Sequence, residues 1–186
     1  QIKSQDFVTQ DVGGVVPLAY SINDLTITLD TSVATNNATV EVTGDLVIGT
    51  AVDVMTISEC VARSQGAGTA NTSTSVEVTS NETILIQAPT ASKLTANNVT
   101  VAAGGNLVPF DSSFYPQISS GALSFSHGLA HPSTASVSVT QDNEITIDEN
   151  VSILATLEDV RIDATPESAG DSFSQHAGAT RAHIPS

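Results

Sequence analysis

The sequence predicts an all-β protein: an antiparallel β-sandwich or jelly roll in a single domain, with an extended N-terminal arm. Apolar residues alternate with Ser, Thr, Asp or Glu along much of the chain, which places them on one face of a sheet. Charged residues make up only 13% of the chain, and there are two lysines, so surface positions that favour helices are scarce. Clusters of Gly, Asn and Asp divide the alternating stretches into about eleven short strands, as in sandwiches and jelly rolls.

The stretch from residue 134 to residue 163 shows the alternation most clearly. Its apolar residues keep one parity within each of four runs: Ala135, Val137 and Val139; Ile145 and Ile147; Val151 and Ile153; Val160 and Ile162. The polar sequences between the runs are rich in residues that form turns. We therefore expect a β-meander with turns at 141–144 and 148–150.

In chain order we expect an arm (1–14) ending in a Gly13-Gly14 hinge, a β-sandwich domain (15–163) and a polar C-terminal tail (164–186). Short alternating runs predict the strands of the domain, which include 25–29, 40–42, 46–48, 52–61, 76–78, 84–86 and 99–101. A turn is expected around Ser80-Asn81. Residues 63–75 consist mostly of Gly, Ala, Ser, Thr and Asn, which predicts a surface loop.

A parallel β-solenoid is the alternative fold. The segments VEVTGDLVIG (40–49), LTANNVTVAAGG (94–105) and ITIDENVSI (145–153) resemble coils of a stacked repeat. A solenoid is expected to show one repeat period, whereas the turns here are irregularly spaced. The irregular spacing favours the sandwich.

The charge of the chain excludes several classes of partner. The formal net charge is −15 and the isoelectric point is about 4.1. A surface this acidic repels nucleic-acid phosphates and anionic lipid headgroups. No run approaches the ~18 apolar residues that a membrane helix needs, so membrane insertion is not expected. Gln1 is a residue with which a processed secreted chain can begin, and we therefore expect an extracellular or cell-surface protein.

Five N-glycosylation sequons agree with that location. They begin at Asn37, Asn71, Asn81, Asn98 and Asn150, and all are expected at strand edges or turns. Cys60 is the only cysteine, so no disulfide can form within the chain. Its neighbours Met55, Ile57 and Val61 predict a buried, inert thiol in a strand.

Catalytic motifs lack the context that they require. His127 and His131 have i, i+4 spacing, but Gly128 and Pro132 oppose the helix that would bring both to one metal ion. The sequence Gly170-Asp171-Ser172-Phe173 resembles the nucleophile block of GDSL-type hydrolases, which follows a strand of an α/β sheet. Here it lies in the polar tail of an all-β chain. We therefore expect a protein that is not an enzyme.

The acidic residues of the predicted meander are the best candidates for a metal site. Asp142, Glu144, Asp148 and Glu149 would crowd one hairpin, and Ca²⁺ binds six to eight oxygen atoms of such loops. No EF-hand or other calcium motif is present. The sequence thus predicts no cofactor apart from a candidate structural calcium ion; the alternative is a solvated acidic face.

The N-terminal arm suggests how copies of the chain would associate. Ile2, Phe7 or Val8, and Val12 are spaced for alternate pockets of a neighbouring sheet, and Gly13-Gly14 would let the arm swing. Such donor-strand exchange would give a homopolymer; the alternative is an arm that pairs with its own sheet.

We therefore expect an extracellular structural protein, the subunit of a surface filament or pilus-like polymer. Its composition is similar to that of archaeal and bacterial extracellular fibre subunits. The alternative is a secreted monomeric adhesin or carbohydrate-binding module, which would bind glycans through the acidic hairpin or a loop around Phe114-Tyr115.

Overall fold

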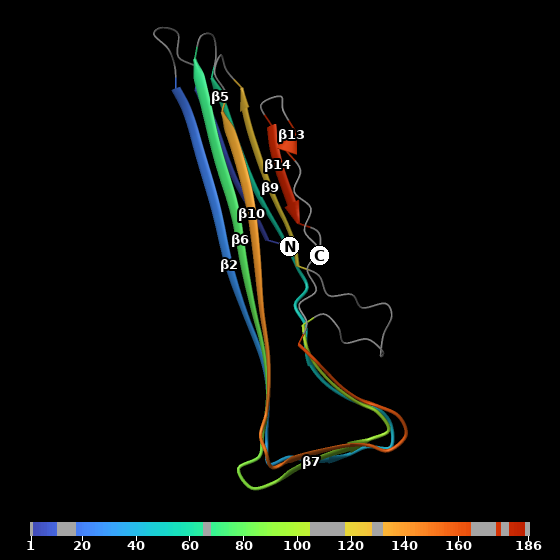
Figure 1. Cartoon of the computed structure of the whole chain (residues 1–186). Helices are drawn as coiled ribbons and strands as arrows, with labels where there is room; N and C mark the ends of the chain where they lie inside the picture. Colours follow the sequence, from blue (N-terminus) through green and yellow to red (C-terminus); the bar gives the residue numbers. More distant parts are fainter. Residues whose placement is uncertain are drawn as a thin grey trace.

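The computed structural model describes residues 2–10, 18–64, 68–104, 118–127, 132–164, 174–175 and 179–184. All regular structure in these ranges is β, which confirms the predicted all-β class (Figure 1). Among the described residues, no helix is long and apolar enough to cross a membrane.

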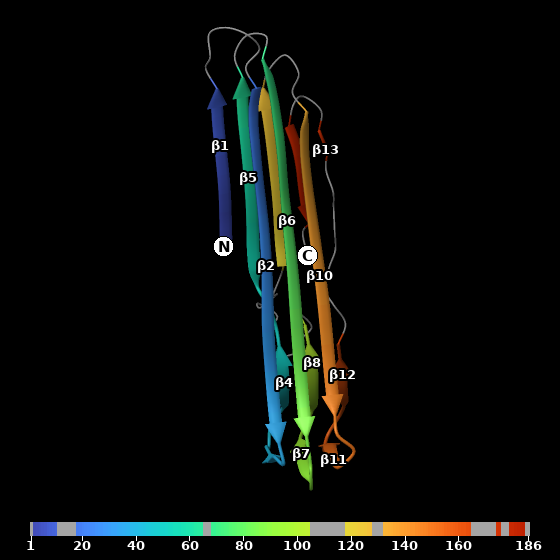
Figure 2. The ribbon, with the colours of Figure 1, turned by 90° about the vertical axis from the view of Figure 1, so that its left-hand side faces the viewer.

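The chain passes three times around a common axis, and each pass lies beside the one before it (Figures 1 and 2). The first pass comprises β2 (Leu18–Asn36), β3 (Thr39–Glu41), β4 (Leu46–Thr50) and β5 (Val54–Ser64). The second comprises β6 (Thr69–Gln87), β7 (Ser92–Ala96), β8 (Val99–Ala103) and β9 (Ile118–His127). The third comprises β10 (Ser133–Ile147), β11 (Val151–Ala155) and β12 (Val160–Asp163).

Equivalent strands of successive passes pair in parallel, in the orders β10-β6-β2, β11-β7-β3 and β12-β8-β4. A fourth sheet has the order β1-β5-β9-β14-β13. It begins with β1 (Ile2–Gln10), parallel to β5, and ends with β14 (Ala179–Ile184) and β13 (Ser174–Gln175), which pair antiparallel. Figure 2 shows β2, β6 and β10 side by side. At the rise per residue of a β-strand, the 19 residues of β6 span about 60 Å.

The antiparallel sandwich is therefore not the arrangement of the described strands, which corresponds to the solenoid-like alternative. The repeat escaped detection because its length varies. The spacing between register partners is 51 residues from Leu18 to Thr69 and 61 residues from Thr72 to Ser133. The three coil-like segments do stack: Val40 of the first pairs with Leu94 of the second, and Ile153 of the third pairs with Leu94 from the other side.

The interior changes character along the long strands. Towards their C-terminal ends, Ile84 and Ile86 of β6 pack with Leu94 of β7 and with Val99 and Val101 of β8 in an apolar core. Towards their N-terminal ends, the β2-β6-β10 sheet lies close to the β5-β9 sheet (Figure 1), and the buried residues are small, such as Ala19, Ala62 and Ala70. Small side chains allow this close approach of the two sheets.

Hydroxyl groups between the closely packed sheets are paired with one another. Thr56 Oγ1 donates to Ser120 Oγ at 2.9 Å, and Ser124 Oγ donates to Thr72 Oγ1 at 2.6 Å. Ser58 Oγ and Thr74 Oγ1 lie 2.7 Å apart within hydrogen-bond geometry. These bonds offset the cost of burying polar groups.

Three predicted irregular segments differ from the structure. The turn at 141–144 is absent because β10 continues through it to Ile147, and the turn at Ser80-Asn81 lies inside β6. Of the predicted loop 63–75, residues 63–64 belong to β5 and the residues from Thr69 onward belong to β6. The turn at 148–150 is present, between β10 and β11.

Candidate functional site

Two regions could carry function. One is the N-terminal strand β1 together with the open edges of the long sheet β10-β6-β2, and the other is a polar layer on the inward face of that sheet. The structure places the predicted arm on its own chain, where residues 2–10 pair with residues 56–64 of β5. A single chain does not test exchange with a neighbouring copy, so exchange stays a prediction.

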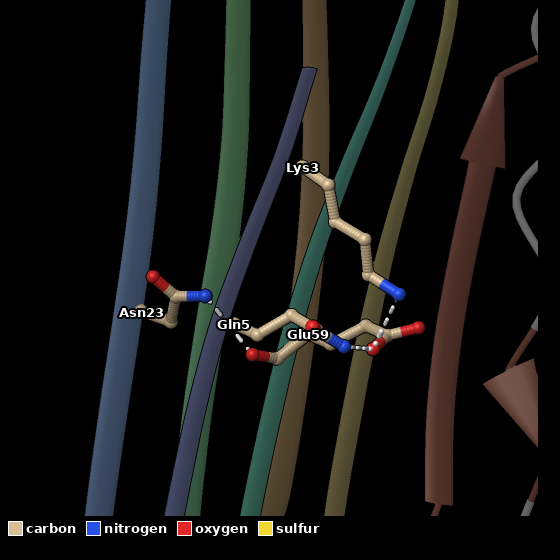
Figure 3. Close-up of polar contacts among 4 residues, drawn as sticks. All are labelled: Lys3, Gln5, Asn23 and Glu59. Carbon is tan, nitrogen blue, oxygen red and sulfur yellow. Dashed lines mark hydrogen bonds and ion pairs between the residues drawn. The ribbon is translucent and has the colours of Figure 1, made fainter. Parts of the chain in front are cut away.

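Polar side chains join β1 to the rest of the chain. Lys3 Nζ lies 3.1 Å from Glu59 Oε2 of β5, and Gln5 Nε2 donates to the same carboxylate (Figure 3). Asn23 Nδ2 of β2 donates to the backbone oxygen of Glu59 at 2.9 Å (Figure 3). Ser4 Oγ of β1 donates to Asn23 Oδ1 at 2.7 Å.

Glu59 is the acidic centre of this set. The hydrogen bond from Gln5, followed by the hydrogen bond and charge of Lys3, lowers the pKa of the Glu59 carboxyl group below its ordinary value of 4.5; burial opposes this effect only in part. Glu59 therefore stays ionised at neutral pH, where it attracts β1 to β5.

The apolar side chains of β1 are not anchored within the chain. Phe7 is 60% exposed and Ile2 is 40% exposed, so neither fills a pocket of its own domain. Val8 belongs to β1, but the structure does not describe its side chain. Val12 and the Gly13-Gly14 hinge lie outside the described residues.

The long sheet has two open edges among the described strands. β2 pairs only with β6, and β10 pairs only with β6. The inward residue Val78 of β6 is fully buried, whereas its register partners Ile27 of β2 and Val139 of β10 are only half-buried. Both edges thus present a row of backbone groups and a partly exposed apolar interior.

On the inward face of the long sheet, a layer of polar residues lies between apolar residues on either side. Glu82 of β6 points inward and is 1% exposed, and its register partners are Thr31 of β2 and Asn143 of β10. In the neighbouring register position, Ser80 of β6 is fully buried and pairs with Gln141 of β10. Sequence reasoning missed this layer because it assigned both polar stretches to turns; their inward parity was the signal.

The four residues predicted to bind calcium do not converge. Asp142 and Glu144 occupy exposed positions of β10, alternating with the inward Gln141 and Asn143. Asp148 Oδ2 accepts a hydrogen bond of 2.9 Å from the backbone N–H of Ala88, and Glu149 is exposed. Within the described ranges, no three His, Cys, Asp or Glu side chains are grouped so that they could hold a metal ion.

The sequon asparagines occupy two kinds of position. Asn37 and Asn150 are exposed at corners of the coil. Asn71, Asn81 and Asn98 are half-buried, and the amides of the last two donate to Asp30 at 2.8 Å and to Asp45 at 2.7 Å. Asn150 Nδ2 also donates, to the backbone oxygen of Ala88 at 3.1 Å, so the exposed Asn37 is the most accessible of the five; glycan attachment stays a prediction for all.

Of the remaining candidates from the sequence, the structure describes Cys60 and His127. Cys60 is fully buried, as predicted, and its Sγ donates to the backbone oxygen and Oγ of Ser21, each at 3.0 Å. His127 is exposed at the end of β9, while His131 lies outside the described residues. The sequences Phe114-Tyr115 and Gly170–Phe173 also lie outside them.

Comparison with known proteins finds no matching family model, curated protein or solved structure.

Proposed function

We propose that the protein is a non-enzymatic, extracellular structural protein whose copies join end to end into a filament at the cell surface. The observation that carries this proposal is the pair of open edges, β2 and β10, at opposite sides of the long sheet. Because β2, β6 and β10 all run in the same direction, β2 of one copy can continue the parallel sheet beyond β10 of another. A head-to-tail contact of this kind generates an open filament.

Most of the inward residues of the two edges match in kind; the exceptions are Asn23 with Ala135, Leu29 with Gln141 and Thr35 with Ile147. Continued pairing in the same register would set Leu25 beside Val137 and Ile27 beside Val139 of the next copy. It would also set Thr31 beside Asn143, a polar residue beside a polar one. The matching pairs favour this register, since a slip by one residue would turn the apolar side chains Leu25 and Ile27 to the solvent.

The strand β1 supplies a second element of the proposed contact. It extends the β5-β9 sheet on the same side as β2, and its side chains Phe7 and Ile2 remain exposed. We propose that these side chains pack against a neighbouring copy, with β1 either remaining on its own chain or exchanging as the donor strand.

Charged substitutions on the edges test the proposal. Ile27→Lys places a charge at the inward, half-buried face of the β2 edge, and Val139→Lys does so at the β10 edge. Thr28→Lys and Thr140→Lys are matched controls, because these outward residues are next in sequence. Sedimentation velocity and electron microscopy are expected to show polymers for the unsubstituted chain and both controls, and monomers for both inward variants.

Circular dichroism of each variant establishes that it is folded before its association is compared. A chain that remains monomeric at high concentration would overturn the proposal, as would inward variants that polymerise as the controls do. A deletion of residues 1–14 tests the arm separately. It is expected to weaken polymerisation, and polymerisation of undiminished strength would exclude β1 from the contact.

A further inference from the structure

Glu82 carries the only carboxylate of the polar layer, and the described residues give it no counter-charge. Its Oε2 atom is buried and has no hydrogen-bond partner. Of the four Lys and Arg side chains that the structure describes, Lys3 and Arg161 pair with Glu59 and Asp163, and Arg63 and Lys93 are exposed. A buried carboxylate oxygen that has neither a counter-charge nor a hydrogen-bond partner is unfavourable.

The neighbours of Glu82 have unused oxygen atoms as well. The buried, unpartnered atoms are Ser80 Oγ, Gln141 Oε1, and both Oδ1 and Nδ2 of Asn143. Asn143 is the register partner of Glu82, and Gln141 is the register partner of Ser80, so the four side chains occupy adjacent positions of β6 and β10 on one face. The layer therefore gathers a carboxylate, two amide oxygens and a hydroxyl group.

The contrast with the hydroxyl groups between the closely packed sheets shows what is unusual here. There, buried Thr56, Ser58 and Ser124 each bond to another side chain. In the polar layer, the atoms are shielded from water and still make no such bond. Thr35, Thr50 and Thr95 also have a buried hydroxyl without a partner, but among the described residues every such carboxylate or amide atom lies in this layer. Oxygen atoms that surround a metal ion have this property, because a bound ion takes the place of the missing partners.

We infer that Glu82, Asn143, Gln141 and Ser80 form an interior binding site for a single calcium ion between β6 and β10. Ca²⁺ accepts carboxylate, amide and hydroxyl oxygens in flexible geometry, whereas Mg²⁺ requires a near-ideal octahedron and gives up its water reluctantly. The ion would supply the missing positive charge for Glu82 and hold the third pass against the second. This site differs from the exposed carboxylates of Asp142 and Glu144, and it does not depend on assembly of the chain.

Thermal unfolding and calorimetry of the full chain test the inference. After dialysis against a chelator, CaCl₂ is expected to raise the melting temperature progressively with its concentration, by roughly 5 °C at a hundredfold excess over the dissociation constant. MgCl₂ at the same concentration is expected to have a much smaller effect. No rise with calcium, or an equal rise with both ions, would overturn the inference.

Two matched substitutions locate the ion. Glu82→Gln is expected to weaken calcium binding at least about tenfold, whereas Glu77→Gln, which removes an exposed carboxylate from the same strand, is expected to leave it unchanged. Equal binding by the two variants would place the ion elsewhere and overturn the inference.

A third variant keeps the test informative if Glu82→Gln does not fold. Asn143→Asp adds a second carboxylate to the layer, so it is expected to lower the calorimetric dissociation constant for calcium at least about tenfold. It is also expected to lower the melting temperature in chelator, because two like charges then share the layer. Unchanged calcium affinity in Asn143→Asp would overturn the inference.

Discussion

The side-chain amide of Asn98 donates a hydrogen bond of 2.7 Å to Asp45, a residue of the preceding pass. The oxygen of the same amide accepts a bond of 3.2 Å from the backbone N–H of Asp159, in the following pass. Asn97 also spans three passes, since it donates to the backbone oxygen of Thr43 at 2.7 Å and accepts from Thr156 Oγ1 at 3.3 Å. Two adjacent asparagines thus hold one corner of the coil together.

Asn98→Ala is expected to lower the free energy of unfolding by about 1–2 kcal/mol, because it leaves Asp45 and the backbone of Asp159 without their partner. Urea denaturation followed by circular dichroism, on protein produced without N-glycans, measures this change. Asn36→Ala, at an exposed position that ends β2, is the control and is expected to change stability by less than about 0.5 kcal/mol. Equal losses in both variants would contradict a role for the corner.

Acid is expected to loosen β1 from β5. The pKa of Glu59 is lowered in the folded chain, so its contribution to stability is present above the ordinary value of 4.5 and is lost as the pH falls through the folded value. The contribution is small, about 0.5 kcal/mol, because the Lys3–Glu59 pair lies near the surface. Amide hydrogen exchange of residues 2–10, corrected for its intrinsic pH dependence, is expected to show less protection at pH 3 than at pH 7.

Glu59→Gln provides the control for this pH effect. It removes the titrating group, so β1 in this variant is expected to show the same corrected protection at both pH values, at the level that the original chain shows in acid. Glu77→Gln removes an exposed carboxylate from β6 and is expected to preserve the loss of protection in acid. A pH effect that persists in Glu59→Gln would assign it to another group.

The sequence predicted the faces of the strands far better than their partners. The alternation of Val76, Val78, Ile84 and Ile86 defines one face of β6 correctly, and the structure buries all four residues. Alternation carries no information about strand direction, however. The direction depends on contacts between passes more than 50 residues apart, such as Leu18 with Thr69, and the unequal spacing of these contacts concealed the repeat.

Polar residues inside the long strands account for the missed turns. Ser80 and Glu82 break the apolar alternation of β6, and Gln141 and Asn143 break that of β10 at the register-paired positions. Each break is typical of a turn when one strand is considered alone. Their parity marks each residue as inward in the local sequence, but only the pairing of the two strands reveals that the breaks coincide in one candidate cation layer.

The start of β6 was not predicted for a different reason, which is the close packing of the two sheets. Ala70, Thr72 and Thr74 are buried because the opposite sheet also presents small side chains, such as Ser58 and Ser124. A strand interior built from Ala, Ser and Thr has the composition of a surface loop. Residues 2–10 of the predicted arm form the strand β1 in the sheet of the chain itself, where Ile2 and Phe7 remain exposed.

The inward parity of β6 makes a direct prediction about its core. Ile84→Ala is expected to lower the free energy of unfolding by about 3 kcal/mol, because Ile84 is fully buried beside Leu94 and Val99 and its removal leaves a cavity. Thr83→Ala, at the adjacent outward position, is expected to cost less than about 1 kcal/mol. Urea denaturation of both variants measures the difference, and similar losses would contradict the assigned faces.

The thiol of Cys60 is expected to be inert in the folded chain. Its side chain is fully buried, and Sγ donates to Ser21 between the two closely packed sheets, so a thiol reagent can reach it only when these sheets separate. Labelling with Ellman's reagent is therefore expected to be negligible in buffer and to reach one equivalent in denaturing urea. Arg63→Cys adds a thiol at an exposed position of the same strand. In this variant, one thiol is expected to react with the reagent at once and the second, Cys60, only in urea. Rapid labelling of the original chain in buffer would show that the sheets part readily, contrary to the close packing around Cys60.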